Sequence, residues 1–265
     1  MDVAFFQVNF YSKTLKRLVS LNALIPVDTF GIPGQEMIER GPMKSLYLLH
    51  GYSGNHMDWV GGTNIQELSL LHNIAVFMPS GENNFYLDDT DKGELHAEFV
   101  GNELLEFTRN VFPISAKRED TFIGGLSMGG FGALRNGLKY SHNFSGIIAL
   151  SSALITKNIA GIPVDFKDAI ADYNYYKRVF GDLNKLMGSD KDPEELLLRL
   201  KRANATIPKI FMACGTEDFL LSENRDYHSF LMKQGVEHTY VEAPGVHNWV
   251  FWNEFIEKGI KWMLR

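Results

Sequence analysis

The sequence has a single cysteine, no cluster of basic residues and no long apolar run. Cys214 stands alone among 265 residues, so an intramolecular disulfide is excluded, and no Cys/His spacing suits structural zinc. The net charge of −6 comes without a basic run, which argues against nucleic acid as a partner. No stretch reaches the roughly 18 consecutive apolar residues that cross a bilayer. We therefore expect no metal ion, no nucleic acid and no membrane.

The opening residues also lack the features of a secretory signal. Residues 1–6 show no basic segment followed by an apolar core and a small-residue cleavage site, so we expect a cytoplasmic protein. Apolar residues make up 45% of the chain, which is enough to bury a sheet on both faces. A length of 265 residues suits one large α/β domain.

The most informative motif is residues 125–129, Gly-Leu-Ser-Met-Gly, which match the nucleophile elbow G-x-S-x-G. At such an elbow a strand turns sharply into a helix, and the serine takes a strained backbone conformation that exposes its hydroxyl. Gly125 and Gly129 fit because a Cβ would collide with neighbouring backbone at so tight a corner. A β-prone run precedes the serine and a helical pattern follows it, so Ser127 is the predicted nucleophile.

A serine hydroxyl needs a neighbouring base, usually an imidazole that a carboxylate orients. In the α/β-hydrolase arrangement the chain order is Ser, then Asp or Glu, then His, and four histidines follow Ser127. His247 lies in a turn-rich loop just beyond a predicted strand, where this fold places its chemistry. His142 lies in a polar connection, His228 within a predicted helix, and His238 opens a strand. We predict His247 as the base and keep the other three as alternatives.

The predicted acid follows an apolar strand that ends at Gly215. Glu217 and Asp218 come directly after this glycine, and Asp218 precedes His247 by 29 residues. We choose Asp218 because it stands one place further along, where the turned chain can aim its side chain at the base. Glu217 is the main alternative, and otherwise it would point to solvent or cap the next segment. Cys214 is predicted to be a small buried side chain, with a redox-sensitive thiol as the alternative.

The oxyanion hole needs two backbone donors. One is the N–H of the residue after the nucleophile, here Met128, and the second comes from the loop after a β3-type strand. A buried-strand run at 45–49 leads into His50, Gly51 and Tyr52, and by position Tyr52 is the predicted second donor. Gly51 would shape the turn. His50 is predicted to hold the loop by bonds to backbone rather than to transfer protons.

Apolar runs that alternate with helical stretches predict the α/β-hydrolase fold, with a mostly parallel central sheet and helices on both faces. The predicted strands lie at about 45–50, 74–79, 119–125, 145–151, 207–214 and 238–243. Before and between them, we predict a hairpin from 3–11 and 17–25, a loop at 31–42 and an amphipathic helix at 94–110.

The regular alternation of predicted strands and helices ends after residue 154. About fifty residues separate two strands there, more than a single crossover needs. We expect residues 155–205 to form a cap whose aromatic and apolar side chains line the substrate pocket, with a structural decoration packed elsewhere as the alternative. Trp59 and Trp249 are further candidates for the pocket wall. Trp252 is as well explained by packing at the start of the last helix.

Five segments together resemble the esterase D group of α/β-hydrolases, and within it the tributyrin-esterase-like and feruloyl-esterase-like members. These are residues 7–12 (QVNFYS), 49–55 (LHGYSGN), 78–86 (MPSGENNFY), 125–130 (GLSMGG) and 214–219 (CGTEDF). The resemblance runs over nearly the whole chain. It implies a carboxylesterase without a cofactor, with a triad of Ser127, Asp218 and His247 and oxyanion donors at Met128 and Tyr52.

The leading interpretation is therefore a serine carboxylesterase that acts on small-molecule esters, with acetyl, butyryl or feruloyl-type acyl groups. The family also includes S-formylglutathione hydrolases and mycolyl-type acyltransferases, so a thioesterase or acyltransferase with the same triad is the first alternative. A binding protein on a hydrolase scaffold is an alternative of another class. A homo-oligomer stays open.

Overall fold

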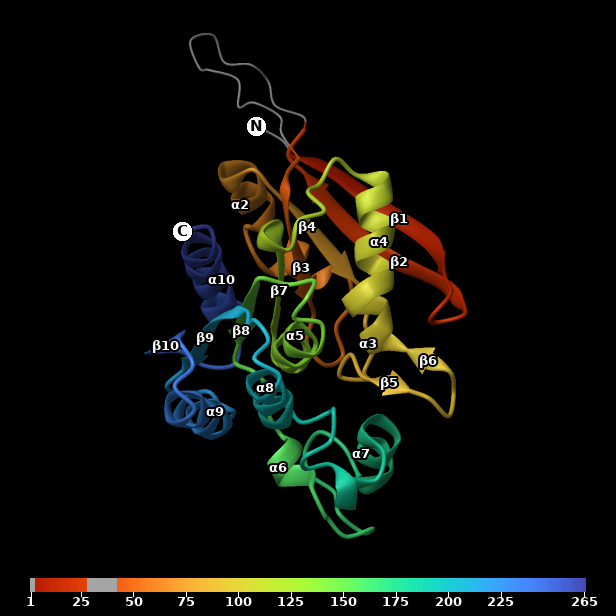
Figure 1. The fold of residues 1–265 in the computed structure, drawn as a ribbon, viewed down its shortest axis with the longest axis vertical. Coiled ribbons are helices and arrows are strands. Elements are labelled where there is room, and N and C mark those ends of the chain that lie inside the picture. Colours follow the sequence, from red (N-terminus) through yellow and green to blue (C-terminus); the bar gives the residue numbers. More distant parts are fainter. Residues whose placement is uncertain (1–2, 28–41) are drawn as a thin grey trace.

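Eight strands form one mixed sheet in the computed structural model, which describes residues 3–27 and 42–265 (Figure 1). Their order across the sheet is β1-β2-β4-β3-β7-β8-β9-β10. They are β1 (Ala4–Ser12), β2 (Arg17–Ile25), β3 (Lys44–Leu49), β4 (Ile74–Pro79), β7 (Thr121–Leu126), β8 (Gly146–Leu150), β9 (Lys209–Gly215) and β10 (His238–Ala243). The hairpin β1–β2 is antiparallel and β2 runs antiparallel to β4, whereas all other neighbours are parallel. The predicted α/β class with a mostly parallel sheet is confirmed.

The predicted strand boundaries agree with the structure to within two residues. Continuous apolar runs are reliable for the central strands β3, β4, β7 and β8, which are buried on both faces, so almost every position there excludes polar side chains. β4 and β7 are buried along their whole length. The predicted loop at 31–42 lies outside the described residues, apart from residue 42 itself.

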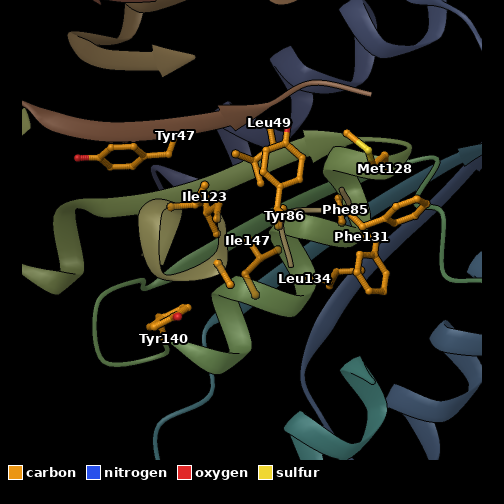
Figure 2. Close-up of a cluster of buried hydrophobic side chains, with 14 of the residues drawn as sticks. Tyr47, Leu49, Phe85, Tyr86, Ile123, Met128, Phe131, Leu134, Tyr140 and Ile147 are labelled. Atoms are coloured by element: carbon orange, nitrogen blue, oxygen red, sulfur yellow. The ribbon is translucent and has the colours of Figure 1, made fainter. Parts of the chain in front are cut away.

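Helices cover both faces of the sheet, as expected. α4 (Leu104–Val111), α5 (Met128–Lys139) and α9 (Leu221–Lys233) pack on one face, and α1 (Asp58–Gly62), α2 (Ile65–His72) and α10 (Trp249–Met263) on the other. The alternation of side chains along each strand separates the two layers. In β3, Tyr47 and Leu49 join the α5 layer, whereas Leu46 and Leu48 join the α10 layer. Figure 2 shows Tyr47 and Leu49 in the first of these clusters, together with Phe131 of α5.

The helix predicted at 94–110 is only partly right. Its first two residues form β6 (Glu94–Leu95), which pairs with β5 (Asp88–Asp89) in a short separate hairpin. Helical structure then begins with α3 (His96–Glu98), passes through a π-helical turn, η1 (Phe99–Glu103), and continues as α4. The later start has a local cause: Asp88 accepts hydrogen bonds from the backbone N–H groups of Ala97 (2.8 Å) and Glu98 (3.2 Å), which caps the first turn.

Residues 155–205 contain α6 (Thr156–Ile159), α7 (Tyr173–Phe180), the 3₁₀ turn η3 (Leu183–Lys185) and α8 (Pro193–Arg202). Figure 1 shows α6 and α7 at the lower end of the molecule, below α5. The segment has its own apolar anchor. The ring of Phe180 packs 4.9 Å from that of Phe85 and 5.8 Å from that of Phe131, centroid to centroid, so the end of α7 is continuous with the main core.

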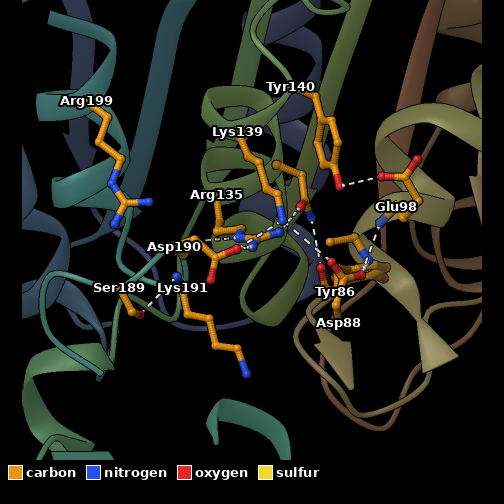
Figure 3. A network of polar contacts seen from close by, with 12 residues as sticks. Tyr86, Asp88, Glu98, Arg135, Lys139, Tyr140, Ser189, Asp190, Lys191 and Arg199 are labelled. Atoms are coloured by element: carbon orange, nitrogen blue, oxygen red, sulfur yellow. Dashed lines mark hydrogen bonds and ion pairs between the residues drawn. The ribbon is translucent and has the colours of Figure 1, made fainter. Parts of the chain in front are cut away.

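A polar network fixes this segment to α5 (Figure 3). Arg135 of α5 is only 1% exposed, and its guanidinium donates to the carboxylate (2.7 Å) and the backbone carbonyl (2.9 Å) of Asp190. Lys139 adds a second ion pair to the same carboxylate at 3.0 Å. On its other side, the Arg135 guanidinium donates to the Asn136 side chain, which in turn donates to the carbonyl of Tyr86. The helix that starts at the elbow is thus held from both flanks.

Within residues 3–27 and 42–265, no helix has the length and apolar character needed to cross a bilayer.

Candidate active site

The elbow adopts the strained geometry that its sequence predicts. Ser127 has φ +54° and ψ −121°, and its N–H donates to the carbonyl of Leu150 at 2.8 Å. Both elbow glycines are required by close backbone approach. A Cβ on Gly125 would lie 2.3 Å from the carbonyl oxygen of Gly129, and one on Gly129 would lie 2.2 Å from that of Leu49. The backbone therefore packs so closely around Ser127 that neither position 125 nor position 129 can hold a side chain.

The structure brings the three predicted side chains into one hydrogen-bonded row. His247 Nε2 lies 3.0 Å from Ser127 Oγ, and His247 Nδ1 lies 2.9 and 3.0 Å from the two carboxylate oxygens of Asp218. A carboxylate only accepts, so Nδ1 carries the proton and Nε2 is left to accept from the serine hydroxyl. The three residues follow β7, β9 and β10, whose carboxyl ends share one edge of the sheet.

Asp218 is a buried carboxylate whose charge is stabilised by its partners. Its side chain is fully covered, and burial alone would raise its pKa. Hydrogen bonds from His247, from the Leu220 N–H at 2.9 Å and from Ser151 outweigh that cost and hold the pKa below its usual value. Asp218 therefore stays ionised at neutral pH, as its predicted role of stabilising an imidazolium requires.

Glu217, the alternative acid, makes no hydrogen bond to His247 within the described residues. Instead it exchanges two hydrogen bonds with Gly245: its carboxylate accepts from the Gly245 N–H at 2.7 Å, and its own N–H donates to the Gly245 carbonyl at 3.0 Å. Thr216 also donates to the carboxylate at 2.8 Å. Glu217 therefore fastens the loop that carries the base. Of the two carboxylates, Asp218 is the one that hydrogen-bonds to His247, and it is also the one predicted from its place one residue further past Gly215.

His50 holds the predicted oxyanion loop through backbone bonds. The Gly81 N–H donates to its Nε2 at 2.8 Å, so Nδ1 must carry the proton, and it donates to the Gly51 carbonyl at 2.7 Å. Burial lowers the pKa of His50, which keeps the ring neutral. The His50 carbonyl accepts from the buried hydroxyl of Tyr86 at 3.1 Å. Both ring nitrogens are occupied, which matches a structural rather than a proton-transfer role.

The loop that carries Tyr52, the predicted second oxyanion donor, runs beside the elbow. A Cβ on Gly51 would lie 2.8 Å from the Leu126 side chain, so the loop runs directly against the strand before the serine. Met128 is the first residue of α5, and its N–H has no acceptor within the helix. The side chain of Asn83 accepts from the Ser53 N–H at 2.7 Å, which fixes the residue after Tyr52. Sequence reasoning missed Asn83, because its role depends on a loop thirty residues away.

The aromatic side chains around the base differ from the expectation. Trp59 is 1% exposed and donates its indole N–H to the Leu49 carbonyl at 3.1 Å, so it belongs to the core and not to a pocket wall. Trp249 is half-buried and packs between Trp59 and Trp252, at 5.6 and 5.2 Å between centroids. Trp252 is the tryptophan that touches the His247 ring, edge to face at 4.8 Å.

Phe219 covers the base from another side. Its ring lies 4.5 Å from that of His247, centroid to centroid, and it is 66% exposed. It follows the acid directly in sequence, but the sequence alone gave no reason to assign an exposed phenylalanine to the site. Trp252 and Phe219 together limit the directions in which the imidazole can turn.

The remaining candidates lie apart from this row. His142 is exposed, and His228 and His238 bond to each other at 2.7 Å, with His238 Nδ1 donating to the Val236 carbonyl. Cys214 is buried, and burial raises its thiol pKa to about 12, in agreement with the prediction of a small buried side chain. In the part of the chain that the structure describes, no three histidine, cysteine or acidic side chains gather in a way that fits a metal ion.

Comparison with known proteins places the chain in a family. A family model described as "Putative esterase" matches residues 35–263. The chain is also 59% identical to an acetyl esterase from Caldicellulosiruptor saccharolyticus over 261 residues, which cover 98% of each chain. The chain belongs to this esterase family. The predicted membership and the predicted class, a carboxylic ester hydrolase, are confirmed.

Solved structures of related proteins share the whole fold. FphF, a fluorophosphonate-binding serine hydrolase from Staphylococcus aureus, is 27% identical with a TM-score of 0.86, and S-formylglutathione hydrolase FrmB from the same organism is 27% identical with a TM-score of 0.84. In both cases all of each chain is covered. A ferulic acid esterase is 22% identical with a TM-score of 0.73 over 100% of this chain and 99% of that one, a likeness of fold. The α/β-hydrolase fold is thereby confirmed, whereas the tributyrin-like and feruloyl-like branches remain predictions.

Proposed function

We propose that this esterase hydrolyses small acyl esters, with acetyl esters as its preferred substrates, through an acyl-enzyme on Ser127. The observation that carries the mechanism is the row from Ser127 through His247 to Asp218, at 3.0 and 2.9 Å. The preference for acetyl groups is supported by the Caldicellulosiruptor acetyl esterase, which shares 59% of its sequence with this chain.

In the first step Ser127 Oγ attacks the ester carbonyl while His247 Nε2 takes its proton, and Asp218 stabilises the imidazolium. The N–H groups of Met128 and Tyr52 donate to the developing oxyanion. His247 then protonates the leaving alcohol. In the second step it takes a proton from water, the resulting hydroxide attacks the acyl carbonyl, and Ser127 leaves with the proton restored.

The test is Ser127→Ala, assayed with p-nitrophenyl acetate and by labelling with a fluorophosphonate. We expect turnover to fall by about 10³- to 10⁶-fold and labelling to vanish. Ser222→Ala, at an exposed position on α9, is the matched control and should keep both. A Ser127→Ala protein that still shows a burst and full turnover would exclude the acyl-enzyme.

A thioesterase acting on S-formylglutathione is the second candidate, because FrmB is 27% identical over the full chain. The triad serves both reactions, so the two differ in kcat/KM and not in the identity of the nucleophile. A comparison of acetyl, butyryl and feruloyl esters with S-formylglutathione decides between them. A higher kcat/KM for the thioester than for every oxygen ester would replace the proposal.

We also propose that residues 155–205 act as a cap that helps to form the substrate pocket. The proposal is supported by α7, whose Tyr175 packs edge to face on Tyr52 at 5.7 Å between centroids. The Tyr175 hydroxyl donates to the backbone carbonyl of Asn83 at 2.9 Å. Tyr175 of α7 thus contacts both Tyr52 and Asn83, the residue whose side chain holds Ser53. Both contacts lie at the predicted oxyanion loop.

A further inference from the structure

A buried serine lies beside the predicted acid. Ser151 follows β8 and is 0% exposed, and its φ of +44° lies in the left-handed region that few residues other than glycine adopt. Backbone strain of this kind gathers at functional sites, where the surrounding contacts hold it. Neither the predicted triad nor the predicted oxyanion hole includes this residue, so its buried hydroxyl calls for an explanation.

The end of β8 lies between the predicted nucleophile and the strand that leads to the predicted acid. On one side, the Leu150 carbonyl accepts from the Ser127 N–H at 2.8 Å, and the Ala153 N–H donates to the Ser127 carbonyl at 3.0 Å. On the other side, the Ser151 N–H donates to the carbonyl of Ala213 in β9 at 2.8 Å. Backbone bonds therefore fix Ser151 where the elbow and the end of β9 come together.

The Ser151 hydroxyl accepts a hydrogen bond from Trp252. The indole N–H of this tryptophan, near the start of α10, lies 3.1 Å from Ser151 Oγ. The same indole packs edge to face on the His247 ring at 4.8 Å between centroids. Trp252 is 6% exposed, so both contacts are shielded from water. One side chain thus joins the predicted base to Ser151.

A hydroxyl that accepts one hydrogen bond still has its own proton to donate. Two acceptors lie beside the Ser151 hydroxyl, the carboxylate of Asp218 and the sulfur of Cys214. A carboxylate accepts strongly and a thiol sulfur only weakly, so the proton goes to Asp218. The Cys214 thiol keeps its own proton, because burial raises its pKa to about 12, and the Glu217 carboxylate bonds to another loop. His247 is thus the titratable side chain that Asp218 faces.

We propose that Ser151 is a positioning residue for the predicted acid, with its hydroxyl accepting from the Trp252 indole and donating to the Asp218 carboxylate. Together with the Leu220 N–H, this donor holds the carboxylate so that both its oxygens stay within 3.0 Å of His247 Nδ1. The donor also withdraws charge from the carboxylate, which sets how strongly the acid holds an imidazolium. The inference rests on the proposed function, because it assigns Ser151 to the same triad.

The first test is Ser151→Ala, assayed with p-nitrophenyl acetate over a range of pH. We expect kcat to fall about 3- to 30-fold, because the carboxylate loses a hydrogen bond that orients it. A carboxylate without this donor holds the imidazolium more strongly, so the acid limb of kcat/KM should move up by about 0.4–1 pH unit. This limb reports on the coupled pair of Asp218 and His247.

Two further variants separate the hydroxyl from its surroundings. Ser151→Gly removes the hydroxyl in a residue that adopts a positive φ without strain, so it should fold even where Ser151→Ala does not and show the same shift. Ser152→Ala is the matched control. The Ser152 hydroxyl is also buried but has no hydrogen-bond partner among the described residues, so its loss should leave kcat within about twofold and the acid limb unmoved. A lower kcat without a shift in both Ser151 variants, or an equal shift in Ser152→Ala, would overturn the proposal.

The part of Trp252 is tested by Trp252→Phe, alone and combined with Ser151→Ala. Phenylalanine keeps an aromatic ring against His247 and removes the N–H that polarises the Ser151 hydroxyl, so the acid limb should move in the same direction by a smaller amount. If the tryptophan acts through the serine, the double variant should show the shift of Ser151→Ala alone. A shift equal to the sum of the two single variants would exclude the path through Ser151.

A measurement without turnover separates this inference from the proposed function. In Ser127→Ala, the proton between His247 Nδ1 and the Asp218 carboxylate is followed by NMR at low field, with and without Ser151→Ala as a second substitution. The stronger acceptor left by the loss of the hydroxyl should move this resonance further downfield. An unmoved resonance overturns the role of Ser151 even if Ser127→Ala abolishes turnover as proposed. A moved resonance in a Ser127→Ala protein that keeps its turnover overturns the esterase mechanism and supports the role of Ser151.

Discussion

The elbow and the segment 155–205 are held in place by different kinds of contact. At the elbow, backbone packs on backbone, and the sites where a Cβ would lie within 2.3 Å of a carbonyl oxygen are glycines. The inserted segment is held by side chains: Arg135 and Lys139 of α5 reach Asp190, and Phe180 enters the core. The first kind of contact leaves a local pattern in the sequence, and the second depends on residues that meet only after folding.

The two regions meet at the predicted oxyanion loop. Asn83 bonds to the loop through its side chain and to Tyr175 of α7 through its carbonyl. The predicted oxyanion loop and the proposed cap are therefore linked by these two hydrogen bonds of Asn83. Variants in the row of Ser127, His247 and Asp218 should abolish turnover. Variants in the ion pairs of Asp190 should lower stability. Variants at the contact between Tyr175 and Asn83 should change activity slightly.

The largest effect is expected for Asp218→Asn. The amide cannot stabilise an imidazolium, and it can donate to Nδ1 and so favour the wrong tautomer of His247. We expect kcat on p-nitrophenyl acetate to fall by about 10³- to 10⁴-fold. Glu217→Gln is the matched control at the neighbouring carboxylate, and it should keep kcat within about tenfold, since it loosens only one loop contact. Similar losses in both variants would contradict the assignment of the acid.

The same difference, between local sequence patterns and contacts that form only after folding, decides which features can be predicted from the sequence. The meeting of Ser127, Asp218 and His247 could be predicted because each follows a strand end with a turn signal, and parallel strands bring their carboxyl ends to one edge. Trp59 was placed in the pocket wrongly, since nothing local tells a buried indole from an exposed one. Arg135 was overlooked, because an arginine in a helix usually lies at the surface.

The second largest effect is expected on stability, for Asp190→Ala. It leaves the buried Arg135 guanidinium with fewer partners, while Lys139 loses an ion pair. Because the Asp190 side chain is 42% exposed, water replaces part of what is lost, and we expect unfolding in urea to become easier by about 1–3 kcal/mol. The kcat on p-nitrophenyl acetate should stay within about threefold of the wild type. Asp165 is exposed in the same segment, so Asp165→Ala should leave the unfolding free energy unchanged. An equal loss of stability in this variant would show that the ion pairs of Asp190 make no specific contribution.

Acid should weaken both regions. Burial alone would raise the pKa of both Asp218 and Asp190. At Asp218 hydrogen bonds, led by that from His247, outweigh the burial and lower the pKa. At Asp190 the positive charges of Arg135 and Lys139 outweigh it and lower the pKa. A carboxyl with a lowered folded-state pKa stabilises the protein fully above its unfolded value of about 3.9 and loses this as pH falls through the folded value. The difference in unfolding free energy between the wild type and Asp190→Ala should therefore be constant near pH 7 and shrink below pH 4. A difference that grows in acid would reverse the sign of the assigned shift.

The smallest effect is expected where the two regions meet, for Tyr175→Phe. The variant keeps the ring that packs on Tyr52 and removes only the hydroxyl that donates to the Asn83 carbonyl. One hydrogen bond of this kind contributes about 0.5–1.5 kcal/mol, so kcat/KM for an acetyl ester should fall about two- to tenfold, while urea unfolding changes little. Tyr173→Phe, two residues earlier in α7, removes a hydroxyl outside this contact and should leave kcat/KM unchanged. If the two variants behave alike, α7 lies beside the oxyanion loop without supporting it, and residues 155–205 are a decoration and not a cap.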